Sequence, residues 1–379
     1  MKVLLAIPCL ERGGTEMQTL NLAKALVLAG HSVKLACYFQ YDEEVLSEFR
    51  QVCSEVFLLG LEKKDSAVLN IRRLANFFSS QKPDVIHVQY MNPGALPILA
   101  ARIANVKKVI ATVHQPYTEY HGLHAKLLLR SAAALCDYFI SVSQVAEISW
   151  FGTRGEVRFE NAKRFPKHFT LHNAVDKQLI NRLVVDNQEQ LSELIDKDKL
   201  QTGFVIGYVG RISREKGVDI LLEAFARVVD DDLDVKLIVV GDGSELKQLK
   251  EKYDSDKFRE KAFFMGLQNW ENAVRFFSLF DVLVVPSRFE GFGLTALEGM
   301  ASGVPVIASN TGGLSEIIES EKSGLLINNG DVEGFANAIK RIYKDEELRG
   351  RLSRNAEKRA AEFDIDLYND KIVKFYNNI

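Results

Sequence analysis

The sequence predicts an α/β protein with two domains, each built around a parallel sheet. Its 379 residues are enough for two domains that each bury a core. A hydrophobic content of 47% provides the side chains to fill both cores. Short runs rich in Val, Ile and Leu alternate with helical patterns from the first residue onward, and this alternation is typical of β-α-β units.

Ten short apolar runs are the predicted strands, five in each half of the chain. They cover residues 2–8, 32–38, 84–89, 108–114 and 138–143 in the first half, and 204–210, 235–241, 262–265, 282–286 and 304–309 in the second. Each series predicts one Rossmann-like domain. The polar, charged stretch 186–201 has no strand pattern, and we interpret it as a linker with a surface helix. We place the domains at 1–178 and 179–364.

The charge, the cysteines and the length of the apolar segments limit the partners and the location that we expect. A net charge of −3 and a pI near 6.2 argue against a chain dominated by nucleic-acid binding. The four cysteines are scattered among apolar neighbours without metal-ligand spacing, so we expect reduced core residues in a cytoplasmic protein. No apolar segment reaches the roughly twenty residues that cross a bilayer, so we expect any membrane contact to be peripheral.

Two carboxylates flank a glycine turn in the segment 287–303, which is the most informative motif of the chain. The apolar run before it predicts a buried strand, so the turn lies at a carboxyl end, where doubly wound sheets bind ligands. Gly291 and Gly293 let a ligand approach the backbone, and the amides of the helix that follows favour a phosphate. Glu290 and Glu298 suit the hydroxyls of a nucleotide sugar, because carboxylates accept paired hydrogen bonds. Two solvated helix charges are the alternative interpretation.

The segment resembles the retaining nucleotide-sugar glycosyltransferases of the GT-B fold, family 4. Their signature is Glu, seven residues, Glu within a Glu-Gly-Phe-Gly setting, and this chain matches it completely. The resemblance implies that Glu290 contacts the transferred sugar and that Glu298 holds the ribose hydroxyls. It also implies donor contacts along the turn, at Gly291, Phe292, Gly293 and Leu294. By the same resemblance, the two domains face each other across a cleft, and a C-terminal helix in 365–379 crosses back to the first domain.

A second loop of the same domain, residues 210–217, carries two cations after a predicted strand. Arg offers a bidentate fork and Lys a point charge, so Arg211 and Lys216 together suit a leaving diphosphate without a metal. Surface cations that serve solubility are the alternative interpretation. The resemblance implies that Arg211 and Lys216 hold the donor phosphates and act in catalysis. Arg214, which lies between them, has no assigned role.

In the first domain, Gly14 and His114 are the candidate site residues. A two-glycine turn in the loop 11–16 is weak evidence for a ligand site by itself, but the resemblance implies a loop that faces the donor phosphates and the acceptor. His114 closes a predicted strand, and a lone His in such a place is more often structural. The resemblance implies that it approaches the donor sugar as a catalytic residue. The other histidines form no ligand array, so we expect no metal site.

Three further segments have other interpretations. The family segment Asn-Gly-Val-Asp is here Asn173-Ala174-Val175-Asp176, so a positive φ at this point would strain Ala174. The Asp-x-Asp in 230–234 is a feature of the metal-dependent GT-A class, but it precedes a strand, at the sheet end opposite the ligand crevice, and we interpret it as a solvated charge run. The apolar segment 121–135, with two basic residues on one face, suits either core packing or an anionic membrane.

By this resemblance, we expect a retaining, hexosyltransferase-type glycosyltransferase that moves a sugar from a nucleotide diphosphate sugar to an acceptor hydroxyl. Its expected role is cell-surface polysaccharide or glycolipid synthesis, with a sugar or a lipid-linked acceptor. We expect no cofactor and no metal. A UDP-sugar is the favoured donor and a GDP-sugar the alternative, with base contacts near Gly266 and Leu267. The expected location is the cytoplasm or the inner face of the membrane, and no nucleic acid is expected as a partner.

Three alternative functions fit the same architecture. A sugar-nucleotide epimerase is disfavoured by the setting of Glu290. A phosphorylase would require a lysine in a pyridoxal Schiff base. A non-catalytic sugar-binding protein would bind the donor but neither transfer nor hydrolyse it.

Overall fold

The structure is a computed structural model of the full chain. It describes residues 1–62, 64–90, 95–118, 121–159, 164–185, 191, 194–195, 203–253, 258 and 260–379. Most of the predicted linker and surface helix in 186–201 therefore lies outside the described residues. Within the described ranges, no helix is both long and apolar enough to cross a bilayer.

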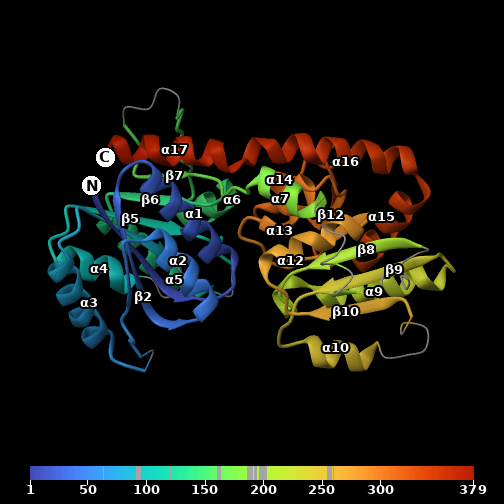
Figure 1. Cartoon of the computed structure of the whole chain (residues 1–379), viewed down its shortest axis with the longest axis horizontal. Helices are drawn as coiled ribbons and strands as arrows, with labels where there is room; N and C mark the ends of the chain where they lie inside the picture. Colours follow the sequence, from blue (N-terminus) through green and yellow to red (C-terminus); the bar gives the residue numbers. More distant parts are fainter. Residues whose placement is uncertain are drawn as a thin grey trace. The chain divides into compact units, whose positions relative to one another are not determined.

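The chain forms two compact units, each with its own parallel sheet (Figure 1). Unit 1 comprises Met1–Ala174 and Ile365–Ile379, and unit 2 comprises Val175–Asp364. Helices and parallel strands alternate in both units, so the predicted α/β class is confirmed.

The sheet of unit 1 has seven strands in the order β3-β2-β1-β4-β5-β6-β7. The strands are β1 (Lys2–Leu10), β2 (Ser32–Tyr41), β3 (Glu55–Leu58), β4 (Val85–Tyr90), β5 (Lys108–Val113), β6 (Tyr138–Ser141) and β7 (His168–Thr170). The helices are α1 (Gly14–Leu28), α2 (Glu43–Val52), α3 (Ala67–Gln81), α4 (Ala95–Ile103), α5 (Gly122–Leu135), α6 (Gln144–Phe151) and α17 (Ile365–Asn377). The edge strand β3 was not predicted, because it has only four residues and none of them is buried.

Both faces of this sheet are covered, which explains the nearly continuous apolar runs of its central strands. Successive residues of β1, such as Val3 and Leu4, belong to two different buried clusters. Helix α17 contributes Phe375 and Tyr376 to the first of these clusters, and the Tyr376 hydroxyl lies 2.8 Å from His87 Nδ1. The predicted packing of the C-terminal helix on the first domain is therefore confirmed.

The sheet of unit 2 has six strands in the order β10-β9-β8-β11-β12-β13. The strands are β8 (Phe204–Val209), β9 (Val235–Val240), β10 (Ala262–Gly266), β11 (Val282–Val285), β12 (Val306–Ser309) and β13 (Leu325–Ile327). The α-helices are α7 (Lys177–Val185), α9 (Val218–Asp230), α10 (Leu246–Lys252), α12 (Trp270–Arg275), α13 (Leu294–Ala301), α14 (Leu314–Ile317), α15 (Val332–Lys344) and α16 (Glu346–Ala360). Three short 3₁₀ helices cover Arg214–Lys216 (η3), Phe276–Leu279 (η4) and Ala361–Phe363 (η5). The three-residue strand β13 was not predicted.

The boundary between the units follows residue 174, four residues before the predicted boundary after residue 178. Val175 pairs with Asp364 in an isolated bridge of unit 2. Helix α7 begins at Lys177 and packs against α12 and α13 of the same unit. The residues between 175 and 178 therefore start the second unit instead of ending the first.

In each sheet, the direction in which successive strands are added changes between two neighbouring strands. The strand order reverses between β1 and β4 in unit 1 and between β8 and β11 in unit 2. Doubly wound sheets bind their ligands at this switch point, outside the carboxyl ends of the strands. In unit 2, the loops that follow β8 and β11 are the two predicted donor loops, so both flank the switch point.

Candidate active site

Backbone hydrogen bonds connect the two predicted donor loops of unit 2, which follow β8 and β11. The carbonyl oxygen of Glu215, after β8, accepts hydrogen bonds from the backbone N–H groups of Arg288 at 2.8 Å and Phe289 at 3.3 Å, after β11. The Arg288 side chain makes two further bonds of 2.7 Å to the carboxylate of Asp219, at the start of α9. Bidentate pairs of this kind add geometric specificity as well as energy. The two loops therefore hold a fixed geometry relative to each other.

Lys216 and Glu290 form an ion pair between these loops. Lys216 Nζ lies 2.8 Å from Glu290 Oε2, and Ser287 Oγ donates to the same oxygen at 3.2 Å. The Lys216 and Glu290 side chains are only 26% and 14% exposed. The structure thus brings together a cation predicted to hold a phosphate and a carboxylate predicted to address a sugar. Because an ammonium has three donors, Lys216 can bind an anionic ligand while it pairs with Glu290.

Two glycines allow the backbone to pack closely around this pair. A Cβ on Gly217 would lie 2.2 Å from the carbonyl oxygen of Pro286, and a Cβ on Gly312 would lie 1.7 Å from the carbonyl oxygen of Glu290. Both glycines also have positive φ angles, of 68° and 52°, which disfavours other residues. A side chain at either position would displace the loop that carries Glu290.

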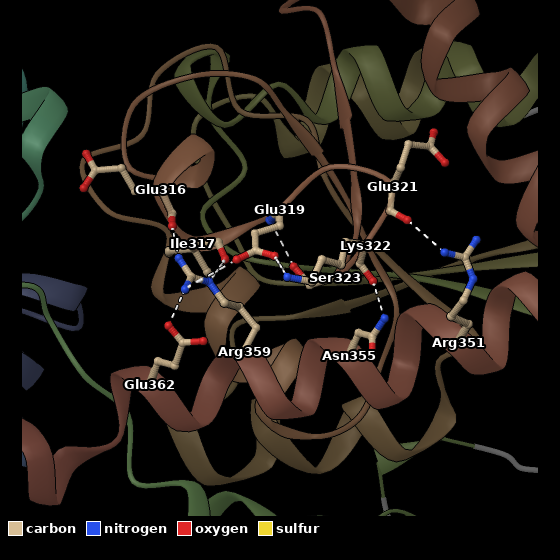
Figure 2. A network of polar contacts seen from close by, with 10 residues as sticks. All are labelled: Glu316, Ile317, Glu319, Glu321, Lys322, Ser323, Arg351, Asn355, Arg359 and Glu362. Atoms are coloured by element: carbon tan, nitrogen blue, oxygen red, sulfur yellow. Dashed lines mark hydrogen bonds and ion pairs between the residues drawn. The ribbon is translucent and has the colours of Figure 1, made fainter.

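An arginine of α16 anchors the segment that follows Gly312 (Figure 2). Arg359 donates to the backbone carbonyl oxygens of Glu316 at 2.7 Å and Ile317 at 3.0 Å. Other members of the network are Glu319, Glu321, Lys322, Ser323, Arg351, Asn355 and Glu362. Arg359 thereby fixes α14, and with it the turn that lies against the backbone of Glu290.

Arg211 lies in the loop after β8 and has an exposed side chain. Its carbonyl oxygen accepts a hydrogen bond of 2.8 Å from the hydroxyl of Tyr208. Burial raises the pKa of Tyr208, the charge of Glu290 raises it further, and the charge of Arg211 lowers it. Arg211 follows β8 in the same loop as Lys216, which pairs with Glu290.

Glu298 accepts a hydrogen bond from the indole of Trp270. Trp270 Nε1 lies 2.8 Å from Glu298 Oε1, and the two residues come from α12 and α13. Burial raises the pKa of Glu298 to about 7, while the indole hydrogen bond acts in the opposite direction. Burial therefore favours the neutral form of this carboxyl group more than in an exposed glutamate. Carboxyl groups with such shifted pKa values are enriched at functional sites.

The turn before α13 presents its backbone and not its aromatic side chain. Gly293 caps the helix with a φ of 106°. The ring of Phe292 is buried, with its centre 5.8 Å from that of Phe363. The predicted donor contacts of Gly291 and Phe292 are thus limited to backbone atoms. The amides of the first helical turn, from Leu294 on, have no intrahelical acceptors and suit an anion.

The predicted base-binding residues lie next to Trp270. Gly266 ends β10 with a φ of 69°, and Leu267 is exposed. Gln268 Nε2 donates to the carbonyl oxygen of Met265 at 2.9 Å, which holds this connection together. Since α12 begins three residues after Leu267, the predicted base region and the predicted ribose carboxylate are neighbours in unit 2.

In unit 1, His114 directly follows β5 and contacts Gln89 of β4. His114 Nε2 and Gln89 Oε1 lie 2.8 Å apart. Burial lowers the pKa of His114 to about 4, so its imidazole is neutral at pH 7. Both residues line a cavity of about 20 Å³, which is enough space for one water. A neutral imidazole can exchange hydrogen bonds with a sugar but provides no positive charge for a phosphate.

Gly14 is the exposed first residue of α1. Two residues later, Glu16 is buried, and a Cβ on Gly13 would lie 2.6 Å from its Oε2 atom. Burial raises the pKa of Glu16. The glycine turn therefore has a structural role in making room for this carboxyl group, and the contact of Gly14 with a donor stays a prediction.

The structure also answers two questions that the sequence left open. Ala174 is not strained, because its φ lies outside the positive region, and its backbone N–H and C=O are bonded to the Gln18 side chain at 3.2 and 2.8 Å. Asp231 of the acidic run lies at the end of α9 that precedes β9 and pairs with Lys340 at 3.1 Å. In the part of the chain that the structure describes, no three His, Cys, Asp or Glu residues are grouped to hold a metal. Metal-independent activity stays a prediction.

Sequence reasoning missed three residues of this region, namely Ser287, Trp270 and Gly312. The Gly312-Gly313 pair after a predicted strand was a readable turn signal. Trp270 gave no signal, because it is 28 residues from Glu298 in the chain and its role depends on how α12 and α13 pack.

Two family models match the chain, one in each half. The model described as Glycosyltransferase Family 4 matches residues 12–149, and the model described as Glycosyl transferases group 1 matches residues 189–359. The candidate residues of unit 1 lie in the first matched range, and those of unit 2 lie in the second.

Known proteins resemble the chain over most or all of its length. The N-acetyl-alpha-D-glucosaminyl L-malate synthase of Bacillus anthracis is 25% identical, over 100% of this chain and 97% of the relative. The UDP-Gal:alpha-D-GlcNAc-diphosphoundecaprenol alpha-1,3-galactosyltransferase of Escherichia coli is 27% identical, over 84% and 82%. The crystal structure of Anabaena Alr3699/HepE in complex with UDP-glucose matches with a TM-score of 0.81 and 21% identity. The match covers 100% of this chain and 100% of that chain. This structural likeness shows the fold.

Proposed function

The chain belongs to the glycosyltransferases of the GT-B fold and family-4 type, and we propose that it moves a hexose from a nucleotide diphosphate sugar to an acceptor hydroxyl with retention and without an obligatory metal. The matching families favour glycosyl transfer over the epimerase and sugar-binding alternatives. One observation carries the assignment of the site: Lys216 and Glu290 form a partly buried ion pair at the switch point of unit 2.

In the proposed site, Lys216 and Arg211 bind the diphosphate. Lys216 is held by Glu290, whereas the exposed Arg211 side chain is available to a ligand. The amides at the start of α13 add donors for the same group. Negative charge builds on the diphosphate as its bond to the sugar breaks, and fixed cations stabilise this charge without reorganisation.

Glu290 is the proposed partner of the sugar. Its Oε2 atom is fixed by Lys216 and Ser287, which orients the carboxylate before the donor arrives. The sugar ring gains positive charge in the transition state, and a carboxylate beside it is stabilising there. His114, neutral at pH 7, is proposed as a hydrogen-bonding partner of the sugar.

Retention is proposed to follow from attack on the face that the diphosphate leaves. The bond between C1 of the sugar and the phosphate oxygen breaks while a bond between C1 and the acceptor oxygen forms. The departing phosphate oxygen takes the proton of the acceptor hydroxyl, so no side-chain nucleophile is required. The products are the glycosylated acceptor and the nucleoside diphosphate.

The donor is proposed to be a UDP-sugar, with a GDP-sugar as the alternative. Support comes from the Anabaena neighbour, whose structures contain UDP and UDP-glucose. The E. coli relative is named for a UDP-Gal donor and a diphosphoundecaprenol-linked acceptor, which supports a lipid-linked acceptor and a role in polysaccharide or glycolipid synthesis.

Replacing Glu298 with alanine is expected to weaken binding of a free nucleoside diphosphate by roughly 1 to 3 kcal/mol, because a charge-assisted bond to the ribose hydroxyls is lost. Titration calorimetry with UDP at pH 8 measures this change. Glu271→Ala, on the adjacent α12 with a 62% exposed side chain, is the matched control and should bind UDP like the wild type. Unchanged affinity in Glu298→Ala would give Glu298 a structural role only.

We also propose a peripheral membrane contact through α5. Leu123, Leu127 and Leu128 of this helix are 74%, 62% and 60% exposed, and Ile103 of the adjacent α4 is exposed as well. Neither helix contains an Asp or a Glu, while α5 contributes Lys126 and Arg130. An exposed apolar surface on two helices that carry positive charges and no acidic residue is complementary to an anionic bilayer.

Sedimentation with vesicles tests this contact. The wild type should sediment with vesicles that contain about 30% anionic lipid and not with neutral vesicles, and Leu123→Ser/Leu127→Ser should lower the bound fraction about fivefold or more. Equal sedimentation of the wild type and the variant would contradict the contact. Self-association of the wild type that the same variant abolishes, without vesicle binding, would instead assign the surface to a second copy of the chain.

A further inference from the structure

The contact between Trp270 and Glu298 is an organised feature of unit 2. The Asn269 side chain caps α12 by accepting a hydrogen bond of 2.8 Å from the backbone N–H of Asn272. Before the cap, Gln268 closes the connection from β10 by bonding to the carbonyl oxygen of Met265. Helix α12 continues directly into η4 and packs against it and against α7. The backbone of Trp270 is thus positioned independently of Glu298, and the bond to Glu298 orients its indole.

The bond to Trp270 occupies only one acceptor position of the Glu298 carboxylate. Trp270 Nε1 bonds to Oε1 at 2.8 Å. A carboxylate has about four acceptor positions, so the second oxygen and the remaining lone pairs can still receive both hydroxyls of a ribose. An indole N–H is only a donor, so it favours the ionised form of the carboxyl group, which is also the stronger acceptor for hydroxyls.

We propose that Trp270 is a positioning residue that acts through Glu298, because its indole N–H keeps this carboxylate ionised and oriented for the ribose of the donor. The proposal rests on the proposed function in that it assumes a nucleotide donor. It predicts a proton-linked affinity for the nucleotide that a purely structural tryptophan would not produce.

The electrostatics of Glu298 support this role. Burial is the main cause that raises its pKa to about 7, and the Trp270 hydrogen bond is the opposing cause. The charged residues on the elements packed against α13 are Lys177 and Arg182 of α7 and, on α16, Glu346, Glu347, Arg349, Arg351, Arg354, Glu357, Lys358 and Arg359. Helix α12 adds Glu271 and Arg275, which pair with each other at 3.7 Å. Burial and the indole, not these charges, set the pKa of Glu298.

The sign of the expected pH dependence follows from these causes. The carboxylate form accepts hydrogen bonds from both hydroxyls, so nucleotide affinity should rise as the pH increases through about 7. Trp270→Phe keeps the ring but removes the N–H, which raises the pKa of Glu298 further. At pH 7, less of the variant is ionised, whereas at pH 9 most of both proteins is ionised.

The first test needs no nucleotide. The chain has two tryptophans, Trp150 and Trp270, so the fluorescence of the wild type minus that of Trp270→Phe isolates the signal of Trp270. This signal should change with pH around a midpoint near 7, and Glu298→Gln should abolish the change. A signal that is flat between pH 5 and 9, or a titration that survives in Glu298→Gln, would overturn the proposal. Trp150→Phe, in unit 1, gives a single-tryptophan protein for a second measurement.

The second test compares UDP affinities of the wild type and Trp270→Phe between pH 6 and 9. The phosphate of UDP also titrates in this range, but its effect cancels in the ratio of the two affinities. The loss in the variant should be about fivefold at pH 7 and below about twofold at pH 9, from the cost of one hydrogen bond to a charged group. In a Glu298→Gln background, Trp270→Phe should add less than about a twofold loss.

The outcomes separate the two hypotheses. A loss that is constant across the pH range, or that adds fully to the loss in Glu298→Gln, would make Trp270 structural and would overturn the proposal. Glu271→Gln, the next residue of α12, is the control and should match the wild type at every pH. If the wild type binds no nucleoside diphosphate at any pH, the proposed function fails, and the fluorescence titration still decides whether Trp270 controls Glu298.

Discussion

Glu290→Ala is expected to lower turnover by roughly 10²-fold or more, while the affinity for a nucleoside diphosphate changes by no more than about threefold. The carboxylate is held by Lys216 and Ser287 at the switch point of unit 2. In the proposed site, Glu290 contacts the sugar and not the base or the phosphates. Its loss should therefore affect the positioning of the sugar and the stabilisation of developing charge.

Initial rates of donor consumption, measured with saturating donor, test this expectation. Glu333→Ala is a suitable control, because this surface carboxylate on α15 pairs only with Arg227 in the contacts described and is 60% exposed. Wild-type turnover in Glu290→Ala would remove Glu290 from the chemistry. A loss of nucleotide affinity as large as the loss of turnover would assign it to the nucleotide instead.

The second large effect concerns the charge of the leaving diphosphate. Arg211→Ala and Lys216→Ala should each lower kcat/KM by roughly 2 to 4 kcal/mol of transition-state stabilisation. Lys216→Arg should restore only part of the activity, because a guanidinium and an ammonium differ in geometry. Activity of the wild type should survive exhaustive treatment with EDTA, since the two side chains are proposed to provide the charge that a divalent cation would otherwise supply.

Arg214 is the matched control for these variants. It lies between the two cations in the same loop and is exposed, so Arg214→Ala should keep kcat/KM within about twofold of the wild type. If EDTA abolished transfer and Mg²⁺ or Mn²⁺ restored it while both alanine variants stayed active, the proposed metal-independent mechanism would be wrong.

The main strands could be predicted because their patterns are local and strong, whereas the packing of the C-terminal helix on the first domain was implied by the family resemblance. Central strands such as β1 are buried on both faces and therefore appear as continuous apolar runs. The edge strands β3 and β13 have four and three residues. Such short segments pair with a neighbour for tertiary reasons and leave little pattern in the sequence.

The candidate site could be predicted only where a loop carries its own motif. The loops after β8 and β11 were recognised, but the sequence gives no register for the bond between Lys216 and Glu290, 74 residues apart. Gly312, after β12, lies against the backbone of Glu290, and Trp270 of α12 bonds to Glu298. Both contacts depend on how the elements pack. Phe292 shows the opposite case, since it lies within the motif but its ring belongs to the core.

Calorimetric titration in excess EDTA tests most directly whether Glu290 binds the sugar and Glu298 binds the nucleotide. Free UDP and a UDP-sugar, with the GDP and ADP pairs for comparison, are titrated into the wild type, Glu290→Ala and Glu298→Ala at pH 8. We predict that one sugar nucleotide binds the wild type more tightly than its free nucleoside diphosphate, that Glu290→Ala removes this difference, and that Glu298→Ala weakens both ligands equally. A difference that persists in Glu290→Ala, or no binding of any nucleotide to the wild type in EDTA, would contradict the account.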